Sequence, residues 1–501
     1  MSPTLIDDTV KDILTSRVYD VAIESPLEKA RKLTSAVGCE VFLKREDLQP
    51  VHSFKLRGAY NKIAQLTQAE CEKGVIAASA GNHAQGVALA AKKLGLSALI
   101  IMPRTTPAIK IEAVKSYGAE VELAGDSYSD AAEFCKKRVT ETGRTFIHPY
   151  DDPLVIAGQG TIGREILEQH PNVTHIFVPV GGGGLLAGCA AYVKALRPDV
   201  KVISVEPADS NAMQQSIKRE KRVVLPYVGI FADGVAVKQV GANTFETALG
   251  KVDDFITVTT DQICAGIKSI FEDTRSIVEP AGALGVAGIA QYDLPKDAHA
   301  VAICSGANVT FERLQQIAER TLIGSGREAM FAVTIPEQPG SLRKFCTDVI
   351  RDHNISEFNY RLNDRSGAHI LVGVNVSGAA DKQKFMDKME KHGYVHVDLS
   401  DDDLTKEHIR HMIGGPAPVV DEHIYEVTFP ERPGALGDFL QAVGTEWNIS
   451  LFHYRSAASD SGSVLIGFET ADNGSLERNL TKAGFAFNKV QHATAVELFT
   501  S

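Results

Sequence analysis

A lysine set in an apolar motif is the first residue of this sequence that could do chemistry. Lys55 lies in Ser53-Phe-Lys-Leu-Arg-Gly-Ala59, early in a stretch with helical periodicity, and Ser53 before it is a candidate N-cap. Burial favours the neutral form of a lysine amine, so a lysine inside an apolar site can act as a nucleophile that forms a Schiff base. The alternative is a solvated surface lysine, because most lysines in proteins are exposed.

Consecutive glycines provide a second candidate site, in this case for an anion. The chain reads Gly181, Gly182, Gly183, Gly184 and Leu185 after the apolar run His175–Val180. Backbone N–H groups without side chains, placed at the start of the apolar helix expected over Leu185–Leu196, suit an anion, most often phosphate. The segment is not a dinucleotide motif, whose third glycine would fall on Leu186, and no Gly-Lys-Ser/Thr follows as in a P-loop. The alternative is a tight corner between strand and helix.

Small residues and amide side chains follow the apolar run Val75–Ala78. Open parallel sheets bind ligands at the carboxyl ends of their strands, so we expect this segment to bind a substrate carboxylate. The expected substrate-binding residues are Ser79, Ala80, Gly81, Asn82 and His83. The Asn82 amide could also hydrogen-bond a ring hydroxyl.

A weaker candidate follows another apolar run, Ala298–Ile303. Ser305, in Ile303-Cys-Ser-Gly-Ala-Asn308, could hydrogen-bond a ring nitrogen. Taken alone, a serine in this position could equally be a turn or N-cap residue.

The elements that must position these residues alternate between short apolar runs and helical stretches. The expected strands are Glu40–Leu43, Val75–Ala78, Ser97–Met102, Glu120–Leu123, His175–Val180, Val200–Val205 and Ala298–Ile303. Helical periodicity lies between them, for example over Gly86–Lys93 and Pro107–Tyr117. This alternation predicts an α/β domain with a mostly parallel sheet and helices on both faces.

An internal duplication begins after residue 325. The segments that start at Phe331 and Tyr425 match through their Pro-Gly pairs, and those that start at Asn354 and Asn448 match at the same offset of 94 residues. Each copy reads as β-α-β-β-α-β, the ferredoxin-like unit. We therefore predict a catalytic domain over 1–325, a first repeat over 326–413, a turn-rich linker over 414–421 and a second repeat over 422–501.

Composition excludes several classes of protein. The formal charge of −11 opposes a nucleic-acid partner, and no apolar run approaches the length needed to span a membrane. The acidic N-terminus lacks the basic residues of a targeting peptide, and no two of the seven cysteines form a Cys-x-x-Cys pair. We expect a cytoplasmic protein, or one of the plastid stroma from which a transit peptide has been removed.

Together these motifs resemble those of the fold-type II pyridoxal-phosphate enzymes, whose catalytic domain is that of the tryptophan synthase β subunit. Within them the chain is most similar to the threonine/serine dehydratases. The two terminal repeats extend the resemblance to the biosynthetic threonine deaminases (threonine ammonia-lyases). The resemblance implies that Lys55 is the Schiff-base lysine, that Gly181–Leu185 bind the phosphate of pyridoxal 5'-phosphate, and that Asn82 and Ser305 contact its phenolic oxygen and pyridine nitrogen.

The same resemblance implies an activity and a form of control. The expected reaction converts L-threonine to 2-oxobutanoate and ammonia, as the first committed step of isoleucine biosynthesis, with L-serine as an alternative substrate. The repeats resemble ACT-like regulatory modules, which implies that they bind isoleucine as a feedback effector, with valine as a second candidate. Their Pro-Gly turns, Pro339-Gly340 and Pro433-Gly434, lead into helix N-termini suited to a carboxylate. The family also implies a homotetramer.

Three readings remain open at this stage: the threonine deaminase, a serine dehydratase or β-replacing enzyme of the same fold, and a non-catalytic amino-acid sensor. Serine racemases of this fold carry a second serine where this chain has Ala80, which disfavours racemisation. The racemase metal site would begin at Glu206 and need an acid at Ala212, so we expect no metal. The repeats could instead serve only to hold subunits together. The pair His408 and His411 lies in a charged segment that favours a solvated surface.

Overall fold

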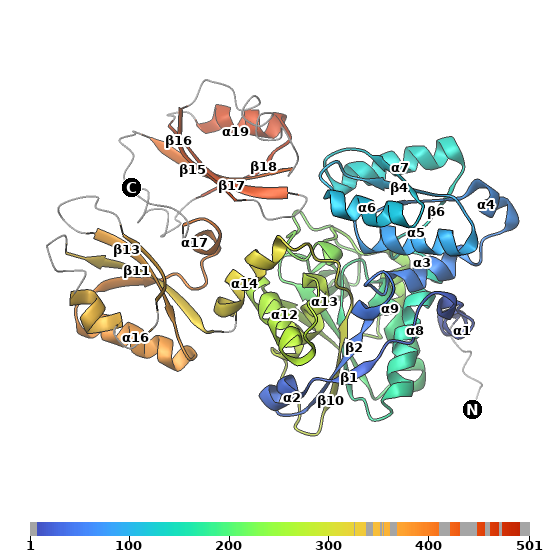
Figure 1. The fold of residues 1–501 in the computed structure, drawn as a ribbon, viewed down its shortest axis with the longest axis horizontal. Coiled ribbons are helices and arrows are strands. Elements are labelled where there is room, and N and C mark those ends of the chain that lie inside the picture. The colour runs from blue at the N-terminus through green and yellow to red at the C-terminus, as the bar shows by residue number, and fades with distance from the viewer. Residues whose placement is uncertain are drawn as a thin grey trace. The chain divides into compact units, whose positions relative to one another are not determined.

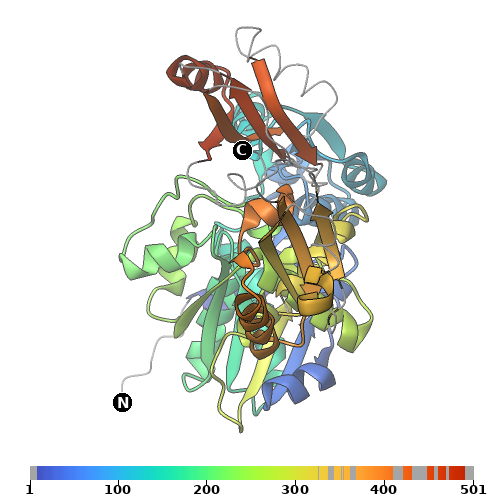
Figure 2. The ribbon, with the colours of Figure 1, turned by 90° about the vertical axis from the view of Figure 1, so that its left-hand side faces the viewer.

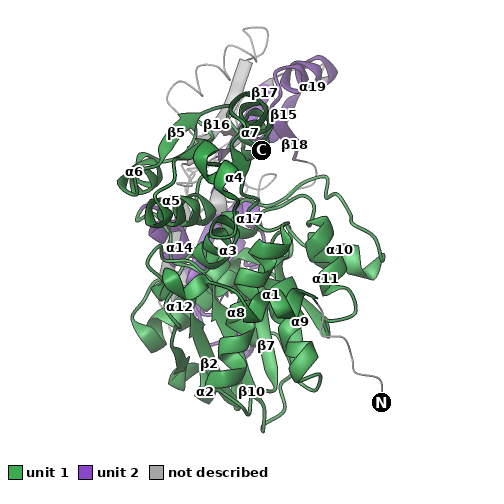
Figure 3. Cartoon of the chain, turned by 90° about the vertical axis from the view of Figure 1, so that its right-hand side faces the viewer, with its two compact units in different colours: residues 1–311 green, residues 312–501 purple. Residues whose placement is uncertain are grey.

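The structure of the 501-residue chain is a computed structural model. It describes residues 8–324, 326–336, 344–350, 353, 355–360, 368–409, 421–430, 448–455, 461–469 and 473–490. The chain forms two compact units, residues 1–311 and 312–501 (Figure 3). The boundary predicted at 325 falls after helix α14 (Arg313–Gly324), which belongs to the second unit because its Ile323 packs there with Met330 and Leu371. The four predicted domain ranges stay a prediction, since most of the linker lies outside the described residues.

The larger sheet of the first unit has six strands in the order β1-β2-β10-β7-β8-β9. These strands are β1 (Leu27–Lys29), β2 (Glu40–Arg45), β7 (His175–Pro179), β8 (Lys201–Pro207), β9 (Asp254–Val258) and β10 (His299–Cys304). All neighbours are parallel except β1, which pairs antiparallel with β2 at one edge. The central strands β7 and β10 are buried along nearly their whole length, as expected for apolar strands covered on both faces.

The smaller sheet has four parallel strands in the order β5-β4-β3-β6. Its strands are β3 (Val75–Ala78), β4 (Ala98–Met102), β5 (Glu120–Leu123) and β6 (Thr145–Phe146). Alternate residues of β4 belong to two different hydrophobic clusters, with Ile100 in one and Ile101 in the other. Both faces of this sheet are therefore buried, which explains why β4 is apolar throughout.

Helices surround both sheets of the first unit (Figure 1). The helices are α1 (Asp8–Leu14), α2 (Arg31–Val37), α3 (Lys55–Ile63), α4 (Gln68–Lys73), α5 (Asn82–Leu94), α6 (Ala108–Ser116), α7 (Tyr128–Thr142), α8 (Pro153–Gln169), α9 (Gly184–Leu196), α10 (Ala212–Lys218), α11 (Ala242–Ala248), α12 (Thr260–Thr274) and α13 (Pro280–Ile289), with short 3-10 turns η1 (Val18–Asp20), η2 (Glu46–Leu48) and η3 (Asp233–Val235). Helix α3 packs against α5 and α8, and α8 packs against α9. No helix in the described part of the chain has the length and apolar character to cross a membrane.

The predicted α/β architecture is confirmed, and each of the seven predicted strands is present. Sequence analysis missed β1, β6 and β9. The first two have three and two residues, too few for a periodic pattern, and β9 begins with the exposed Asp254. The other correction concerns Ser53. Helix α3 begins at Lys55 with Phe54 in the capping position, and the Ser53 hydroxyl only accepts the Lys55 N–H at 3.4 Å.

The second unit contains two four-stranded antiparallel sheets with the same topology, β12-β13-β11-β14 and β16-β17-β15-β18. The strands are β11 (Glu328–Ile335), β12 (Ile355–Tyr360), β13 (Ala368–Asn375), β14 (Val395–Asp398), β15 (Glu422–Pro430), β16 (Asn448–Arg455), β17 (Ser461–Glu469) and β18 (Ala486–Lys489). The other elements among the described residues of this unit are α14, α16 (Ala379–Lys391), α17 (Asp403–Glu407), α19 (Asn473–Lys482) and the π-helical turn η4 (Cys346–Ile350).

This topology confirms the predicted ferredoxin-like repeats. In each copy the first strand lies between the third and fourth, and a helix, α16 or α19, lies against the sheet (Figures 1 and 2). Buried Phe331 and Phe385 stack between β11 and α16, and buried Tyr425 packs with Leu476 in the second copy. The turns at Pro339-Gly340 and Pro433-Gly434 lie outside the described residues.

Candidate active site

One pocket in the first unit brings together the motifs singled out from the sequence. The pocket, together with its opening to solvent, has a volume of about 500 Å³ and lies where β7, β10 and α3 meet. Its lining residues are Phe54, Lys55, Asn82, Pro149, Tyr150, Gln159, Pro179, Gly181, Gly182, Gly183, Gly184, Leu185, Gly234, Val235, Glu279, Ala281 and Ser305. All eight residues predicted to bind the cofactor therefore line one site, although they are up to 250 positions apart in the sequence (305 − 55).

Lys55 is the first residue of α3, and its amine opens into this pocket. Burial lowers the pKa of Lys55 to about 8, while the carboxylate of Glu279 acts in the opposite direction. The backbone just before it is held by Ser305, whose carbonyl accepts the Phe54 N–H at 3.2 Å. A neutral lysine amine is thus accessible near physiological pH, as a nucleophile or general base requires.

The glycine loop between β7 and α9 leaves no room for side chains. A Cβ on Gly181 would lie 2.7 Å from the Cα of Val235, and one on Gly182 would lie 2.3 Å from the ring of Tyr150. Gly183 has a φ of 96°, in the left-handed region that favours glycine. The loop then enters α9 at Gly184, so its N–H groups and the helix N-terminus provide donors for an anion.

Asn82 belongs to a polar network that the sequence analysis did not identify. Its Nδ2 donates to Oε1 of Glu279 at 2.6 Å, and its Oδ1 accepts from Nδ2 of Asn308 at 2.5 Å. The Asn308 N–H donates to the other oxygen of Glu279 at 3.1 Å. Burial raises the pKa of Glu279 to about 7, an effect reinforced by Asp233 and opposed by the hydrogen bond from Asn82.

The remaining residues predicted to bind substrate lie beside the pocket and not in its lining. Ser79, Ala80 and Gly81 are half-buried between β3 and α5, and the Ser79 hydroxyl accepts the Gly81 N–H at 3.3 Å. His83 is buried, and its Nε2 donates to the carbonyl of Ile147 at 2.8 Å. Burial lowers the pKa of His83 to about 3, so this ring stays neutral. Of the five residues, only Asn82 lines the pocket.

Two large side chains complete the walls of the pocket, and neither was predicted. Tyr150 lies against the glycine loop and makes an edge contact with the ring of His148, with their centroids 4.7 Å apart. Gln159, on α8, accepts the Gly58 N–H at 3.3 Å and so links the pocket wall to α3. Sequence analysis singled out neither residue, because Tyr150 lies in a loop and Gln159 stands among the glycines of α8, away from the carboxyl ends of the predicted strands on which the analysis relied.

Glu206, at the position where racemases of this fold begin their metal site, has another role here. Its carboxylate is buried, and its two oxygens accept the N–H groups of Met213 and Gln214, each at 2.8 Å. Among the described residues, no group of three or more His, Cys, Asp or Glu side chains is placed to hold a metal ion. His408, which we expected on a solvated surface, is instead buried in the second unit, where its Nε2 lies 3.4 Å from the hydroxyl of Ser463. His411 lies outside the described residues.

Comparisons with known proteins agree with this arrangement. Residues 18–306 match the family described as pyridoxal-phosphate dependent enzyme, and residues 319–409 and 414–500 match the C-terminal regulatory domain of threonine dehydratase. The chain is 51% identical over 504 residues to the biosynthetic L-threonine dehydratase of Burkholderia multivorans, with 99% of each chain covered. It is 50% identical over 465 residues to the chloroplastic biosynthetic threonine dehydratase of Arabidopsis thaliana, with 92% of this chain and 78% of the relative covered.

A solved structure points to the same family. The processed form of threonine deaminase isoform 2 from Solanum lycopersicum is 47% identical and superposes with a TM-score of 0.61, covering 62% of this chain and 92% of that chain. The two regulatory matches account for nearly all of the residues that follow the match to the pyridoxal-phosphate enzyme family. The chain belongs to the family of biosynthetic threonine dehydratases, pyridoxal-phosphate-dependent enzymes with a duplicated C-terminal regulatory domain.

Proposed function

We propose that this chain deaminates L-threonine to 2-oxobutanoate and ammonia in the pocket that contains Lys55. One observation carries the proposal: Lys55, whose pKa is lowered, and the glycine loop line the same pocket. The loop has no side chains of its own, so its N–H groups are open to an anionic ligand. A lysine and an anion site so combined suit an aldehyde cofactor that bears a phosphate. The alternative of a non-catalytic sensor leaves Lys55 without a role.

The residues of the pocket fit pyridoxal phosphate. We assign the phosphate to the N–H groups of Gly181, Gly182, Gly183, Gly184 and Leu185, where the close approach of Tyr150 and Val235 excludes any side chain. Lys55 would carry the cofactor through its amine, and Ser305 would face the ring nitrogen. Asn82 has two amide hydrogens, of which one is donated to Glu279, and we assign the other to the ring hydroxyl. When bound, the cofactor supplies a conjugated ring that disperses negative charge from the substrate.

The chain's own residues then handle the proton and orient the substrate. The Lys55 amine, neutral above a pH of about 8, can take the proton from the α-carbon of the substrate. Ser305 is uncharged, so it does not hold a proton on the ring nitrogen as a carboxylate would. We propose that N–H groups at the start of α5, beside Ser79, Gly81 and His83, bind the carboxylate of the amino acid.

We further infer that the second unit senses amino acids and that isoleucine, with valine as a second candidate, is its effector. Two regulatory-domain matches and two ferredoxin-like sheets of one topology support a sensing role for this unit. We also propose a homotetramer in the cytoplasm, or in the plastid stroma, as the resemblance implies. No part of this proposal requires a nucleic-acid or membrane partner.

The test is a panel of amino acids assayed for release of ammonia and 2-oxo acid by the purified full-length protein, with and without isoleucine. Threonine should give the highest kcat/KM, and isoleucine should lower the rate at subsaturating threonine. Turnover of serine in clear preference to threonine would assign the enzyme as a serine dehydratase. No 2-oxo acid from any member of the panel would overturn the proposal.

A further inference from the structure

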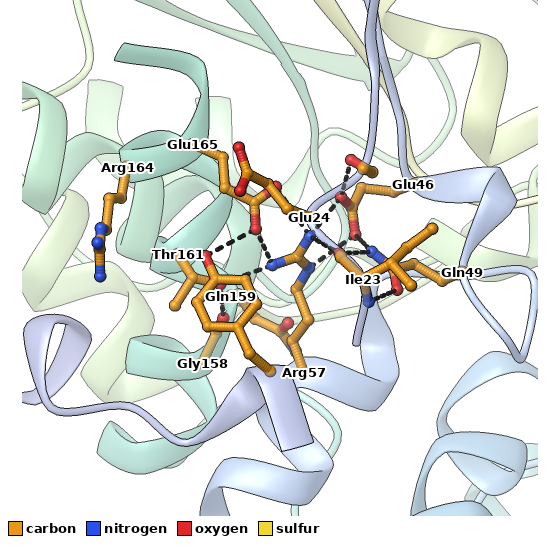
Figure 4. Close-up of polar contacts among 12 residues, drawn as sticks. Ile23, Glu24, Glu46, Gln49, Arg57, Gly158, Gln159, Thr161, Arg164 and Glu165 are labelled. Atoms are coloured by element: carbon orange, nitrogen blue, oxygen red, sulfur yellow. Dashed lines mark hydrogen bonds and ion pairs between the residues drawn. The ribbon is translucent and has the colours of Figure 1, made fainter. Parts of the chain in front are cut away.

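A cluster of buried charges lies directly behind Lys55. Arg57, two residues further along α3, is completely buried between two carboxylates, Glu46 of η2 and Glu165 of α8 (Figure 4). Its Nε and Nη2 each donate to an oxygen of Glu46 at 2.8 Å, and Nη2 also donates to Glu165 at 3.0 Å. Nη1 donates to Glu165 and, at 3.0 Å, to the hydroxyl of Thr161.

The guanidinium is therefore held in one orientation. Nη2 makes a further hydrogen bond to the carbonyl of Ile23 at 3.1 Å, so every nitrogen of the group has an acceptor. The fork of Arg57 is bidentate toward both carboxylates, a geometry that only an arginine can make. Lys44 of β2 also pairs with Glu165, and it donates to the carbonyl of Ser25 at 2.6 Å.

Stability alone does not account for such a cluster. Two cations, Lys44 and Arg57, and two anions, Glu46 and Glu165, have been removed from water, and a well-packed apolar group of similar size is often at least as stable. Burial opposes the ionisation of Glu165, yet Arg57 and Lys44 outweigh it and hold the pKa of Glu165 below its ordinary value. Unlike apolar packing, the hydrogen bonds of the cluster are directional, so each one fixes the position of one side chain relative to its partner.

These hydrogen bonds fix the position of the first turn of α3 relative to α8. A Cβ on Gly158 would lie 2.6 Å from the Cα of Gly58, so the backbones of α8 and α3 touch one residue away from Arg57. Glu165 and the pocket residue Gln159 stand on the same helix, α8. Arg57 thus links the turn that begins with Lys55 to the helix that forms a wall of the pocket.

We propose that Arg57, with Glu46 and Glu165, is a positioning element for Lys55. It does not touch the substrate. Bidentate pairing on both sides keeps the first turn of α3 in register with α8, and so keeps the Lys55 amine at the point where it can bond to the cofactor and reach the α-carbon. The two cations and two anions of the cluster cancel in net charge. The cluster therefore acts on the position of the Lys55 amine and not on its pKa. This inference rests on the proposed role of Lys55.

The test compares Arg57→Lys with wild type as cofactor-loaded full-length proteins. R57K keeps the charge but loses the fork, so its kcat should fall at least tenfold while KM changes less than threefold, because a displacement of about 1 Å can cost a hundredfold in rate. The bound cofactor gives two readouts that do not depend on turnover: its visible spectrum and its covalent bond to Lys55. Borohydride reduction followed by peptide mapping should find a smaller fraction of Lys55 modified in R57K than in wild type.

Arg164→Lys is the matched control. Arg164 precedes Glu165 on α8 but points away from the cluster and pairs with the exposed Glu168 (Figure 4). R164K should match wild type in rate and spectrum. Thr161→Val is a milder second variant, since it removes one acceptor of Arg57 without changing charge, and it should lower kcat two- to fivefold with KM unchanged.

Two results would overturn the proposal. One is a folded R57K with the kcat and the Lys55 modification of wild type, even if its melting temperature is lower, because the cluster would then be structural only. If R57K does not fold, a T161V variant indistinguishable from wild type would have the same meaning. A wild type that is coloured but turns over no amino acid would instead defeat the proposed function, and the reduction assay would still report on Lys55.

Discussion

The Nδ2 atom of Asn82 and the Oε1 atom of Glu279 lie 2.6 Å apart, at the edge of the pocket into which Lys55 opens. The contact determines which way the Asn82 amide faces, since its oxygen is turned toward Asn308. The same carboxylate also raises the pKa of Lys55 against the larger effect of burial. Glu279 is therefore connected with both the orienting amide and the candidate base, although no sequence motif pointed to it.

The first prediction concerns the pH dependence of turnover. Because the neutral amine of Lys55 is the active form, kcat should rise with pH through about 8. Glu279→Gln removes a negative charge that raises the pKa of Lys55, so the rising limb should move to lower pH, by about half to one pH unit. The measurement is the pH profile of kcat for both proteins. Glu246→Gln, at an exposed position on α11, is the control, and an unchanged or upward-shifted limb in E279Q would contradict the assignment.

Replacement of Lys55 tests the centre of the proposed mechanism. Lys55→Ala should lose the visible absorbance of the bound cofactor and at least about 10³-fold in kcat, because the nucleophile and the base are removed together. Lys62→Met on the same helix, where the lysine pairs with Asp152 at 2.8 Å, should change kcat less than twofold. Absorbance spectra and initial rates decide the matter. Undiminished turnover in K55A would remove the central claim.

Much of the candidate site could be predicted because its residues lie in sequence patterns with a direct physical cause. Gly181–Gly184 directly follow an apolar strand, and Lys55 begins a segment with helical periodicity. Apolar strands such as β4 and β7 could be recognised because both of their faces are covered. Glu279 and Gln159 gave no such signal. Glu279 directly precedes the apolar helix α13, and Gln159 is one of several polar residues of α8. Each reaches the pocket only because distant segments of the chain meet there.

The repeats show the same limit at larger scale. Their topology followed from a duplicated sequence, and the structure confirms it. The end of the first unit could not be predicted from the sequence, because the helical pattern of α14 suits either unit. Only the packing of Ile323 with Met330 assigns α14 to the second unit.

Ala80 predicts the stereochemical outcome. Racemases of this fold have a serine at this position that acts as the proton donor on the face opposite the lysine. Ala80→Ser should therefore produce D-amino acid at a low but measurable rate and keep at least about a third of the elimination rate, because Lys55 is unchanged. Chiral chromatography of the products measures both. If A80S forms no D-amino acid, the inference drawn from Ala80 is unsupported.

Glu206 predicts a pH dependence of stability. Burial raises the pKa of Glu206 from 4.5 to about 8, against the two N–H groups that lower it. As pH rises through this window the unfolded chain ionises before the folded one, so this residue lowers the free energy of unfolding progressively. Between pH 5 and 9, the free energy of unfolding of wild type should fall by about 2–4 kcal/mol relative to that of Glu206→Gln. Melting curves test this, with the exposed Glu168→Gln as control. A wild type that gains stability relative to E206Q with rising pH would refute it.

The last prediction separates chemistry from regulation. The hydrophobic clusters of the first unit draw only on residues between Val10 and Ile303, and the whole pocket lies before residue 306. Helix α14 should be removed with the second unit, because its Ile323 is buried there. A chain that ends at Phe311 should therefore fold, keep the visible absorbance of the cofactor and deaminate threonine with a kcat within about threefold of the full chain, since every group assigned to the chemistry is retained.

The response to isoleucine should disappear in this shortened chain, and any sigmoidal dependence on threonine in the full chain should become hyperbolic. The reason is thermodynamic: an effector alters the active site only through a coupling free energy, and removal of the binding unit sets that coupling to zero. Initial rates at several threonine concentrations, with and without isoleucine, measure both effects on the two proteins. Inhibition that persists with the same potency after truncation would place the effector site within residues 1–311, and the second unit would then have to act in assembly and not in sensing.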